Sequence, residues 1–515
     1  MTAGTASDRL ERPVGGGVVR GIAERGLLHW RGIPYAAAPH GLRRFRAPEP
    51  PAAWTDVRDA SEFGPVAPQD RNGQFLGPKP GVPMDEDCLT INVISPATSA
   101  ELRPVMVFIH GGAYSVGSSR EIPRLGEGLV KLGGVVFVSF NYRLGALGYL
   151  DFSSYSTPER PMESNLGLRD QVAALEWVAA NIREFGGDPA NVTLFGESAG
   201  GNAVTTLMTV PKAGGLFARA IAQSSPPNAI YPSDVTARWA ATYLELLSEE
   251  VDNSSTDSTT SEDAAELLAS APVEAIVAAT TRMQLRIPDA EPGTICLSPV
   301  IDGDFLPERP LDAFKFGRAH PLPLIIGTND REGSLFRGRL DILATTPPRI
   351  RAIFARTRKK ARKALKAEYP GLPDQRAAAD FGGDFAFWYP TIKVAERHSR
   401  FARVYFYRFD IAPRLVRMLG YDATHGLELF ALFDRMDGWF GRTMGALGGR
   451  VAFKRVGERM KHHWVRFATD GTVDDAWPKY TSRRRRTLIF DTVDRVEANP
   501  RKTRREAWQR FVPHV

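Results

Sequence analysis

The clearest pointer to the fold is Val192-Thr-Leu-Phe-Gly-Glu-Ser-Ala-Gly200, which is followed closely by an apolar run at residues 203–208. The first four residues predict a buried strand and the later run predicts a helix. Gly196 and Gly200 suit a turn so tight that larger side chains would collide with the strand and the helix. Ser198 between them is expected in a strained backbone conformation that lifts its hydroxyl clear of the sheet edge. It is a candidate nucleophile, and an ordinary serine in a glycine-rich turn is the plain alternative.

A second glycine-rich loop lies upstream, at His110-Gly-Gly-Ala-Tyr114, directly after the apolar run 105–109. Small residues at the end of a strand let backbone N–H groups approach a substrate carbonyl. Such groups stabilise the oxyanion that forms during acyl transfer, and losing one typically costs roughly 3–4 kcal/mol. A loop that merely ended a strand would need no partner motif, and the motif around Ser198 is such a partner. Together the two motifs favour an acyl-transfer hydrolase.

Short apolar runs recur along most of the chain and predict a central sheet. Each is continuous and rich in β-branched or aromatic residues, which is typical of strands covered on both faces. They lie at residues 105–109, 135–139, 192–195, 322–326, 404–409 and 488–490. Between two of them, residues 165–184 place four apolar side chains on one helical stripe: Val172, Leu175, Val178 and Ile182. The order of strands and helices predicts an α/β fold with a mostly parallel central sheet and helices on both faces.

Length and composition limit how this fold is organised. At 515 residues two domains are the first guess, but one large sheet with insertions can absorb this length, and a single domain over 14–515 is expected. Apolar residues make up 43% and charged residues 24%, which are ordinary values for a soluble globular protein. Residues 1–13 are expected to be a flexible N-terminus. The polar stretch near 252–262 is expected to be a mobile loop where the chain leaves the sheet for a helical excursion.

The charge of the chain gives little sign of a polyanionic partner. The net charge of +7 is modest for this length, and no nucleic acid is expected to bind. Of two basic stretches, residues 356–366 are predicted to be one amphipathic helix with Ile353 and Leu365 turned inward and its cations in water, and residues 483–486 to be the charged start of the strand that follows. Contact of the first stretch with an anionic surface is the alternative.

The sequence carries no mark of secretion, membrane insertion or cofactor binding. Cys88 and Cys296 are too few and too far apart for a disulfide framework, which suits a reducing compartment. No apolar run is long enough for a signal peptide or a membrane span. No cluster of metal ligands and no phosphate-binding loop is found, so no cofactor is expected. A cytoplasmic location is expected, and the oligomeric state is left open.

Longer matches identify a family. Residues 185–200 resemble the full active-site signature of the type-B carboxylesterase and cholinesterase family, and residues 86–93 resemble its second signature. The agreement extends to residues 32–36, 45–48, 141–145, 298–303, 464, 467–468 and 477–480, and so covers the chain from about Val14 to Asp491. The resemblance implies an α/β-hydrolase fold with a helical excursion over the active site. It also implies a serine carboxylesterase.

The resemblance implies the rest of the catalytic site. The family's acid loop matches residues 322–333, which gives Glu332 the role of the acid, with Asp330 as the weaker candidate. The family's histidine loop matches Thr424-His-Gly-Leu-Glu428, which gives His425 the role of the base. Ser198, Glu332 and His425 then follow the chain order expected of this fold. Other histidines precede the acid, lie in a predicted helix or are predicted on a helix surface: His320, His398 and the pair His462 and His463.

Each of these residues has an expected role in the chemistry. Ser198 needs His425 to accept its proton, and Glu332 holds the imidazole tautomer without taking the proton itself. By analogy with the family, the N–H groups of Gly112, Ala113 and Ala199 form a three-donor oxyanion hole. Glu197 is expected beside the triad, where it either tunes the electrostatics or is merely structural.

Two departures from the family bear on location and substrate. Ala67 stands where secreted relatives place the disulfide partner of the cysteine that matches Cys88. Cholinesterases hold a quaternary ammonium on a tryptophan shortly before the second signature, and this chain has no tryptophan between Trp54 and Trp177. The expected substrate is therefore a small neutral carboxylic ester and not a choline ester.

Several matters stay open at this stage. A group of side chains either forms an apolar wall of the pocket or packs helices against the sheet: Trp388, Tyr389, Trp439 and Phe440, with Met436 and Met444 as filler. A hydrolase of amides, carbamates or lactones would keep every catalytic residue named above. A non-catalytic scaffold homologue would keep the fold and lose the triad, and the intact motifs argue against it.

Overall fold

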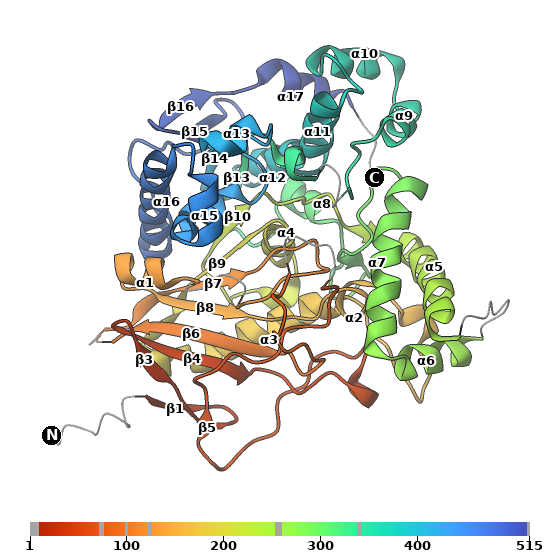
Figure 1. The fold of residues 1–515 in the computed structure, drawn as a ribbon, viewed down its shortest axis with the longest axis vertical. Coiled ribbons are helices and arrows are strands. Elements are labelled where there is room, and N and C mark those ends of the chain that lie inside the picture. Colours follow the sequence, from red (N-terminus) through yellow and green to blue (C-terminus); the bar gives the residue numbers. More distant parts are fainter. Residues whose placement is uncertain are drawn as a thin grey trace.

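The computed structural model describes residues 10–71, 77–97, 101–120, 125–252, 260–336 and 341–511. A sheet of eleven strands runs through its centre in the order β16-β15-β14-β13-β10-β9-β7-β8-β6-β4-β3 (Figure 1). In that order the strands span Arg495–Ala498, Arg486–Phe490, Val404–Phe409, Leu324–Asn329, Arg219–Gln223, Gly187–Glu197, Arg103–Ile109, Val136–Phe140, Thr90–Pro96, Leu27–Pro34 and Ile22–Glu24.

In this order, the strands from β15 to β8 all run parallel to one another. Antiparallel strands flank them, with β16 at one edge and β6, β4 and β3 at the other. The predicted mostly parallel α/β sheet is therefore confirmed, and all the predicted strands lie in it. Two smaller sheets consist of β1 (Glu11–Val14), β2 (Gly17–Arg20) and β5 (Arg58–Asp59), and of β11 (Tyr231–Pro232) and β12 (Val300–Ile301).

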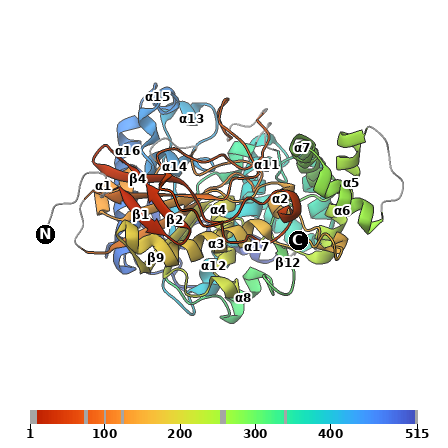
Figure 2. The same cartoon turned by 90° about the horizontal axis from the view of Figure 1, so that it is seen from below.

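Helices cover both faces of the central sheet (Figures 1 and 2). One face carries α3 (Leu166–Asn181), α4 (Ala199–Leu207), α8 (Pro310–Phe316) and α12 (Tyr389–His398). The other carries α1 (Glu127–Gly133), α14 (Leu427–Leu432) and α16 (Arg450–Asp470). The remaining helices are α2 (Ala146–Tyr149), α5 (Ser233–Asp252), α6 (Ser261–Ser270), α7 (Val273–Ala290), α9 (Pro347–Ala355), α10 (Lys359–Glu368), α11 (Gln375–Gly383), α13 (Arg414–Met418), α15 (Trp439–Met444) and α17 (Lys502–Gln509).

Successive side chains of the central strands alternate between two hydrophobic cores. On β7, Val105, Val107 and Ile109 belong to the core beneath α3 and α4. Met106 and Phe108 belong to the core beneath α1, α14 and α16. Because side chains alternate along a strand with a period of two, a strand covered on both faces is apolar at every position. This is why continuous apolar runs mark the sheet in the sequence.

The predicted N-terminal boundary of the folded part was wrong. Strand β1 begins at Glu11, and the Trp30 indole N–H donates to the carbonyl oxygen of Leu10 at 2.8 Å. Trp30 is fully buried, so this hydrogen bond ties the chain to the core before residue 14. The part of the predicted flexible N-terminus at 1–9 lies outside the described residues.

Two other predicted segments were partly wrong. The predicted loop at 252–262 falls mostly outside the described residues, but Ser261 and Glu262 belong to helix α6, which Thr260 caps. The basic stretch 356–366 is not one helix, because α9 ends at Ala355 and α10 begins at Lys359. Between them, the Thr357 hydroxyl donates to a carbonyl four residues back, in the last turn of α9.

Within the described ranges, no single helix has the length and apolar character needed to cross a membrane, and only α6 and α7 taken together, bent by 112°, pass that test. Cys88 and Cys296 are both free and buried. They form no disulfide, as predicted.

Candidate active site

Ser198 lies at a sharp turn between β9 and α4. Its φ of 59° and ψ of −120° are strained for a residue with a Cβ atom, as predicted. A Cβ at Gly200 would lie 2.1 Å from the carbonyl oxygen of Ile109, so only glycine lets α4 pack this closely against β7. The N–H of Ser198 donates to the carbonyl oxygen of Gln223 at 2.9 Å, which holds the turn against β10. The serine side chain is left partly exposed at the carboxyl end of β9.

The three residues predicted as the triad meet in an unbroken chain of close contacts. The hydroxyl oxygen of Ser198 lies 2.7 Å from Nε2 of His425, and Nδ1 of His425 lies 2.6 Å from Oε2 of Glu332. His425 and Glu332 are buried. Glu332 follows β13 and His425 follows β14, so parallel strands carry all three to one edge of the sheet. This geometry allows the imidazole to take a proton from the serine while the carboxylate holds its other nitrogen.

Two further donors hold Glu332 in place. Its Oε1 accepts hydrogen bonds from the N–H of Asn329 at 2.6 Å and from the Ser224 hydroxyl at 2.7 Å. With Oε1 occupied, Oε2 is the oxygen that faces His425. Sequence reasoning missed both donors. Asn329 ends β13, whose first part was predicted, but Ser224 follows β10, a strand that was not predicted.

The acid loop and the histidine loop are joined directly. The N–H of Arg331 donates to the carbonyl oxygen of Ala423 at 3.0 Å, and the Asn329 side chain donates to that of Thr424 at 2.7 Å. Asp330, the weaker candidate for the acid, points elsewhere and forms an ion pair with Arg501. The structure therefore brings Glu332, and not Asp330, to the histidine.

Two more buried carboxylates surround His425. Glu197 Oε1 lies 3.3 Å from Nε2 of His425, so the predicted position of Glu197 beside the triad is correct. Glu428, which sequence reasoning missed, accepts a hydrogen bond from the side chain of Asn329. Burial raises the pKa of Glu197 to about 8 and that of Glu428 to about 7. Burial alone would lower the pKa of His425, but Glu197 and then Glu332 raise it more, to about 9.

The glycine-rich loop after β7 turns back beside the serine. Gly112 has a φ of 114° and Ala113 a φ of 53°, and a Cβ at Gly112 would lie 2.0 Å from the carbonyl oxygen of Val116. A Cβ at Gly111 would lie 3.1 Å from the Cβ of Ser198, so the loop contacts the nucleophile turn directly. No hydrogen bond between described residues engages the N–H of Gly112, Ala113 or Ala199. These three predicted donors are free to bind an oxyanion.

The aromatic residues beside the histidine are not the predicted ones. The rings of Phe387 and Phe336 lie 4.4 and 5.1 Å from the His425 ring, centroid to centroid. Both side chains are buried. Phe336 could have been found, because it lies four residues after Glu332 in one short 3-10 helix, Glu332–Phe336. Phe387 lies in a π-helical turn, Asp384–Trp388, a feature often found at functional sites.

The predicted pocket aromatics pack elsewhere, which favours the packing alternative. Trp388 is buried with its ring under the Arg501 guanidinium at 5.7 Å, and Tyr389 stacks on Trp508 at 5.7 Å. Met436 and Met444 are buried in the core beneath α16, and Phe440 packs against that core. Trp439 is 77% exposed. Adjacent helical residues point in different directions, and Phe387, the neighbour of Trp388, is the one that faces the histidine.

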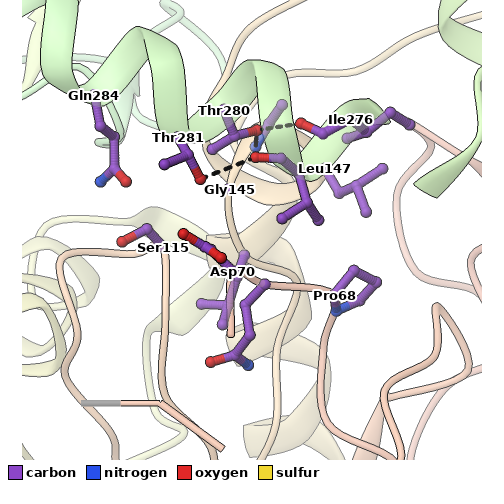
Figure 3. A pocket seen from close by; sticks show the side chains of 13 residues that line it. Pro68, Asp70, Ser115, Gly145, Leu147, Ile276, Thr280, Thr281 and Gln284 are labelled. Atoms are coloured by element: carbon purple, nitrogen blue, oxygen red, sulfur yellow. Dashed lines mark hydrogen bonds between the residues drawn. The ribbon is translucent and has the colours of Figure 1, made fainter. Parts of the chain in front are cut away.

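The helical excursion packs beside the glycine-rich loop. Figure 3 shows α7 above Ser115 and Gly145, with Gln284 facing Ser115 across a cavity of only about 10 Å³. The Thr280 hydroxyl donates to the carbonyl oxygen of Ile276 at 2.7 Å and accepts from the N–H of Ala146 at 3.4 Å. The contact with Ala146 joins α7 to α2, beside Ser115, which directly follows the loop that carries two of the predicted oxyanion donors.

The remaining histidines lie outside the triad. His320 and His398 each place Nε2 near a backbone carbonyl, at 3.0 Å from Val210 and 2.8 Å from Leu322. His462 is exposed on α16, but His463 is buried with its ring 5.1 Å from that of Trp477. The prediction that both lie on the helix surface was wrong for His463. Across the residues that the structure describes, no group of three or more metal-ligating side chains could hold a metal ion.

Comparisons with known sequences identify the family of this chain. The model of the carboxylesterase family matches residues 9–508. The para-nitrobenzyl esterase of Bacillus subtilis (strain 168) is 35% identical over 494 residues, which cover 95% of this chain and 96% of that protein. The phenmedipham hydrolase of Pseudarthrobacter oxydans is 32% identical over 479 residues, which cover 90% of this chain and 91% of that protein.

Comparisons with solved structures agree as well. A PNB esterase structure superposes with a TM-score of 0.84 at 34% identity and covers 98% of this chain and 100% of its own. The carboxylesterase EST55 of Geobacillus stearothermophilus superposes with a TM-score of 0.80 at 32% identity and covers 97% and 100%. Because the family match spans nearly the whole chain and the relatives share its length and fold, this protein belongs to the carboxylesterase family of α/β-hydrolases and hydrolyses carboxylic esters.

Proposed function

We propose that this carboxylesterase cleaves neutral carboxylic esters through an acyl-enzyme intermediate on Ser198. The observation that carries the proposal is the continuous contact from the serine hydroxyl through His425 to Glu332, at 2.7 and 2.6 Å. Serine is a weak nucleophile at its own pKa and needs such a base.

The steps follow from the positions of these atoms. The Ser198 oxygen attacks the ester carbonyl carbon while its proton moves to Nε2 of His425. The carbonyl electrons move onto the oxygen, and the resulting oxyanion accepts hydrogen bonds from the N–H groups of Gly112, Ala113 and Ala199. When the tetrahedral intermediate collapses, the imidazolium gives its proton to the leaving alcohol. Water then repeats the sequence against the acyl-enzyme, which releases the carboxylic acid and restores Ser198.

Two features support a neutral alcohol group in the substrate. The aromatic surfaces at the histidine are the two phenylalanines Phe336 and Phe387, and both are buried. Phenylalanine attracts cations less than tryptophan does. Glu197 would be the nearest anionic partner for a cation, but it lies 3.3 Å from Nε2 of His425, and burial raises its pKa because it disfavours the charged form. A quaternary ammonium group therefore gains little here to offset its dehydration.

The substrate preference is tested with esters and amides of one acyl length. We expect a neutral ester to have a kcat/KM at least about tenfold above that of the choline ester, because Phe336 and Phe387 beside the histidine are buried and offer a cation little aromatic surface. Each added methylene that fits should improve kcat/KM by at most about fourfold, the equivalent of 0.8 kcal/mol. The matching anilide should react more slowly than the ester. A faster choline ester would contradict the neutral substrate, and a faster anilide would favour the amidase alternative.

The role of Glu197 is tested through the pH dependence of the rate. His425 must be neutral to accept the serine proton, so kcat/KM rises as the pH passes upward through the pKa of His425. The Glu197 carboxylate is the leading charge that raises this pKa, because it stabilises the imidazolium from 3.3 Å. Glu197→Gln removes the charge and should move the rising limb to lower pH. An unmoved limb in a folded variant would make Glu197 merely structural.

A further inference from the structure

The helices α9 and α10 carry a strongly basic surface that ester hydrolysis does not use. We call it the basic surface and define it by the cations Arg351, Arg356, Arg358, Lys359, Lys360, Arg362, Lys363 and Lys366. All are exposed except Arg362, which is half-buried. Figure 1 shows these helices at one end of the molecule, and α17 packs beside α10.

The segment 342–367, which contains the basic surface and Arg349, has a net charge that exceeds that of the whole chain. Residues 342–367 contain nine Lys and Arg and no Asp or Glu, whereas the net charge of the full chain is +7. The rest of the chain therefore carries a net charge of −2, the difference between +7 and +9. This segment is therefore strongly basic in a chain that is otherwise close to neutral.

The cations of the basic surface are not neutralised from within the protein. No carboxylate of a described residue lies within 4 Å of any of them. By contrast, Arg349 on the same helix α9 pairs with Asp289 at 2.7 Å and with Asp341 at 3.3 Å. At the edge of the surface, Glu368 already accepts a hydrogen bond from Thr503 at 3.1 Å.

The placement of these cations opposes helix formation. The first turn of α10 contains no acidic residue, and Arg358, Lys359 and Lys360 stand at its N-terminus, where the helix dipole favours negative charge. Lys359 and Lys363 are four residues apart on one helix, and like charges at that spacing repel each other. An anionic partner would relieve both effects.

The fold does not depend on these side chains. The apolar faces of α9 and α10 are buried in the larger core through Ile350, Ile353, Phe354 and Leu365. Most of the cations project from the opposite faces into solvent, whereas Nζ of Lys366 lies 5.8 Å from the centre of the Phe354 ring and Arg362 is half-buried. Replacing them should therefore leave the packing of both helices intact.

We propose that the basic surface binds the anionic headgroups of a lipid bilayer. Attraction between clustered Lys and Arg and a bilayer is delocalised and needs no shaped pocket, which suits long side chains on two short helices. Single-stranded nucleic acid binding relies on aromatic side chains for base stacking, and no aromatic residue of α9 or α10 is exposed. The choice of a bilayer rests on the proposed function, because neutral esters of low solubility gather in membranes.

The test is sedimentation of the full chain with vesicles of phosphatidylcholine alone or with phosphatidylglycerol as roughly one lipid in three. We expect binding to the anionic vesicles only, with release as NaCl rises from about 0.05 to 0.5 M. A variant with Lys359, Lys360, Lys363 and Lys366 replaced by Gln should bind at least about tenfold more weakly. Its turnover of a water-soluble ester should match the wild type, which shows that it is folded.

A matched control removes the same charge from scattered exposed cations of similar type: Lys212, Arg286, Lys479 and Arg484, each replaced by Gln. This variant should keep most of the vesicle binding. Equal loss in both variants, no binding by the wild type, or tighter binding to a single-stranded oligonucleotide would each overturn the proposal. If the fourfold variant does not fold, a double variant with Lys360→Gln and Lys363→Gln replaces it. Its control is the double variant with Lys212→Gln and Lys479→Gln, and the same outcomes decide. A wild-type protein that hydrolysed no ester would instead contradict the proposed function.

Discussion

Replacement of Ser198 by alanine should lower kcat/KM for a neutral ester by about a million-fold. The hydroxyl oxygen of Ser198 forms the bond to the acyl group in the proposed mechanism, and it lies 2.7 Å from Nε2 of His425. Without it, His425 and the oxyanion donors could at best assist direct attack by water. The same change should abolish covalent labelling by an organophosphonate, which should add one equivalent to the wild type. Labelling is followed by mass spectrometry of the intact chain.

Ser115→Ala provides the matched control. Ser115 is a buried serine beside the active-site loop, and its hydroxyl donates to the carbonyl oxygen of Gly112 at 3.2 Å. Losing this hydrogen bond should cost about tenfold or less in rate, and labelling should remain at one equivalent. One equivalent of label on Ser198→Ala would place the nucleophile elsewhere in the chain.

The central sheet could be predicted from the sequence because of how its strands are covered. Runs such as 105–109 and 404–409 are apolar at nearly every position, since their side chains pack alternately into two hydrophobic cores. The break between α9 and α10 could not be predicted, because cations continue through residues 356–358 and conceal the end of α9. The start of β9 at Gly187 was also missed, because its first five residues, Gly-Asp-Pro-Ala-Asn, form no apolar run, and Gly187 joins the sheet by pairing with Arg103 of β7.

The catalytic residues could be predicted because they belong to motifs with fixed spacing, but their supports could not. Ser224 and Asn329 matter because β10 and β13 are neighbours in the sheet, and that adjacency appears only in the fold. Glu428 reads as an ordinary helical carboxylate until its burial beside Glu332 is seen. The sequence analysis named Trp388 as a pocket residue and missed its neighbour Phe387. The π-helical turn directs Phe387, and not Trp388, to the histidine.

Glu332→Gln should lower kcat/KM by up to about ten-thousand-fold while preserving the shape of the side chain. In the structure, Oε1 of Glu332 accepts from both the N–H of Asn329 and the hydroxyl of Ser224. A glutamine must place its amide oxygen there, because an NH₂ group would face two donors. Its NH₂ group then faces Nδ1 of His425 and forces that nitrogen to accept. The imidazole proton moves to Nε2, which can no longer take the proton of Ser198.

Asp330→Asn separates this tautomer effect from a general loss of negative charge near the site. Asp330 neighbours Glu332 in the chain but pairs with Arg501 and lies 3.6 Å from Arg408, away from the histidine. Its replacement should reduce kcat/KM by less than about tenfold, since part-exposed ion pairs contribute little. Both variants should unfold within a few degrees of the wild type, since neither leaves a cavity. Histidine proton NMR should show Nε2 protonated in Glu332→Gln. A larger loss of activity in Asp330→Asn than in Glu332→Gln would contradict the assignment of Glu332 as the acid. An unchanged tautomer in Glu332→Gln would contradict the role that the hydrogen bonds give to Glu332.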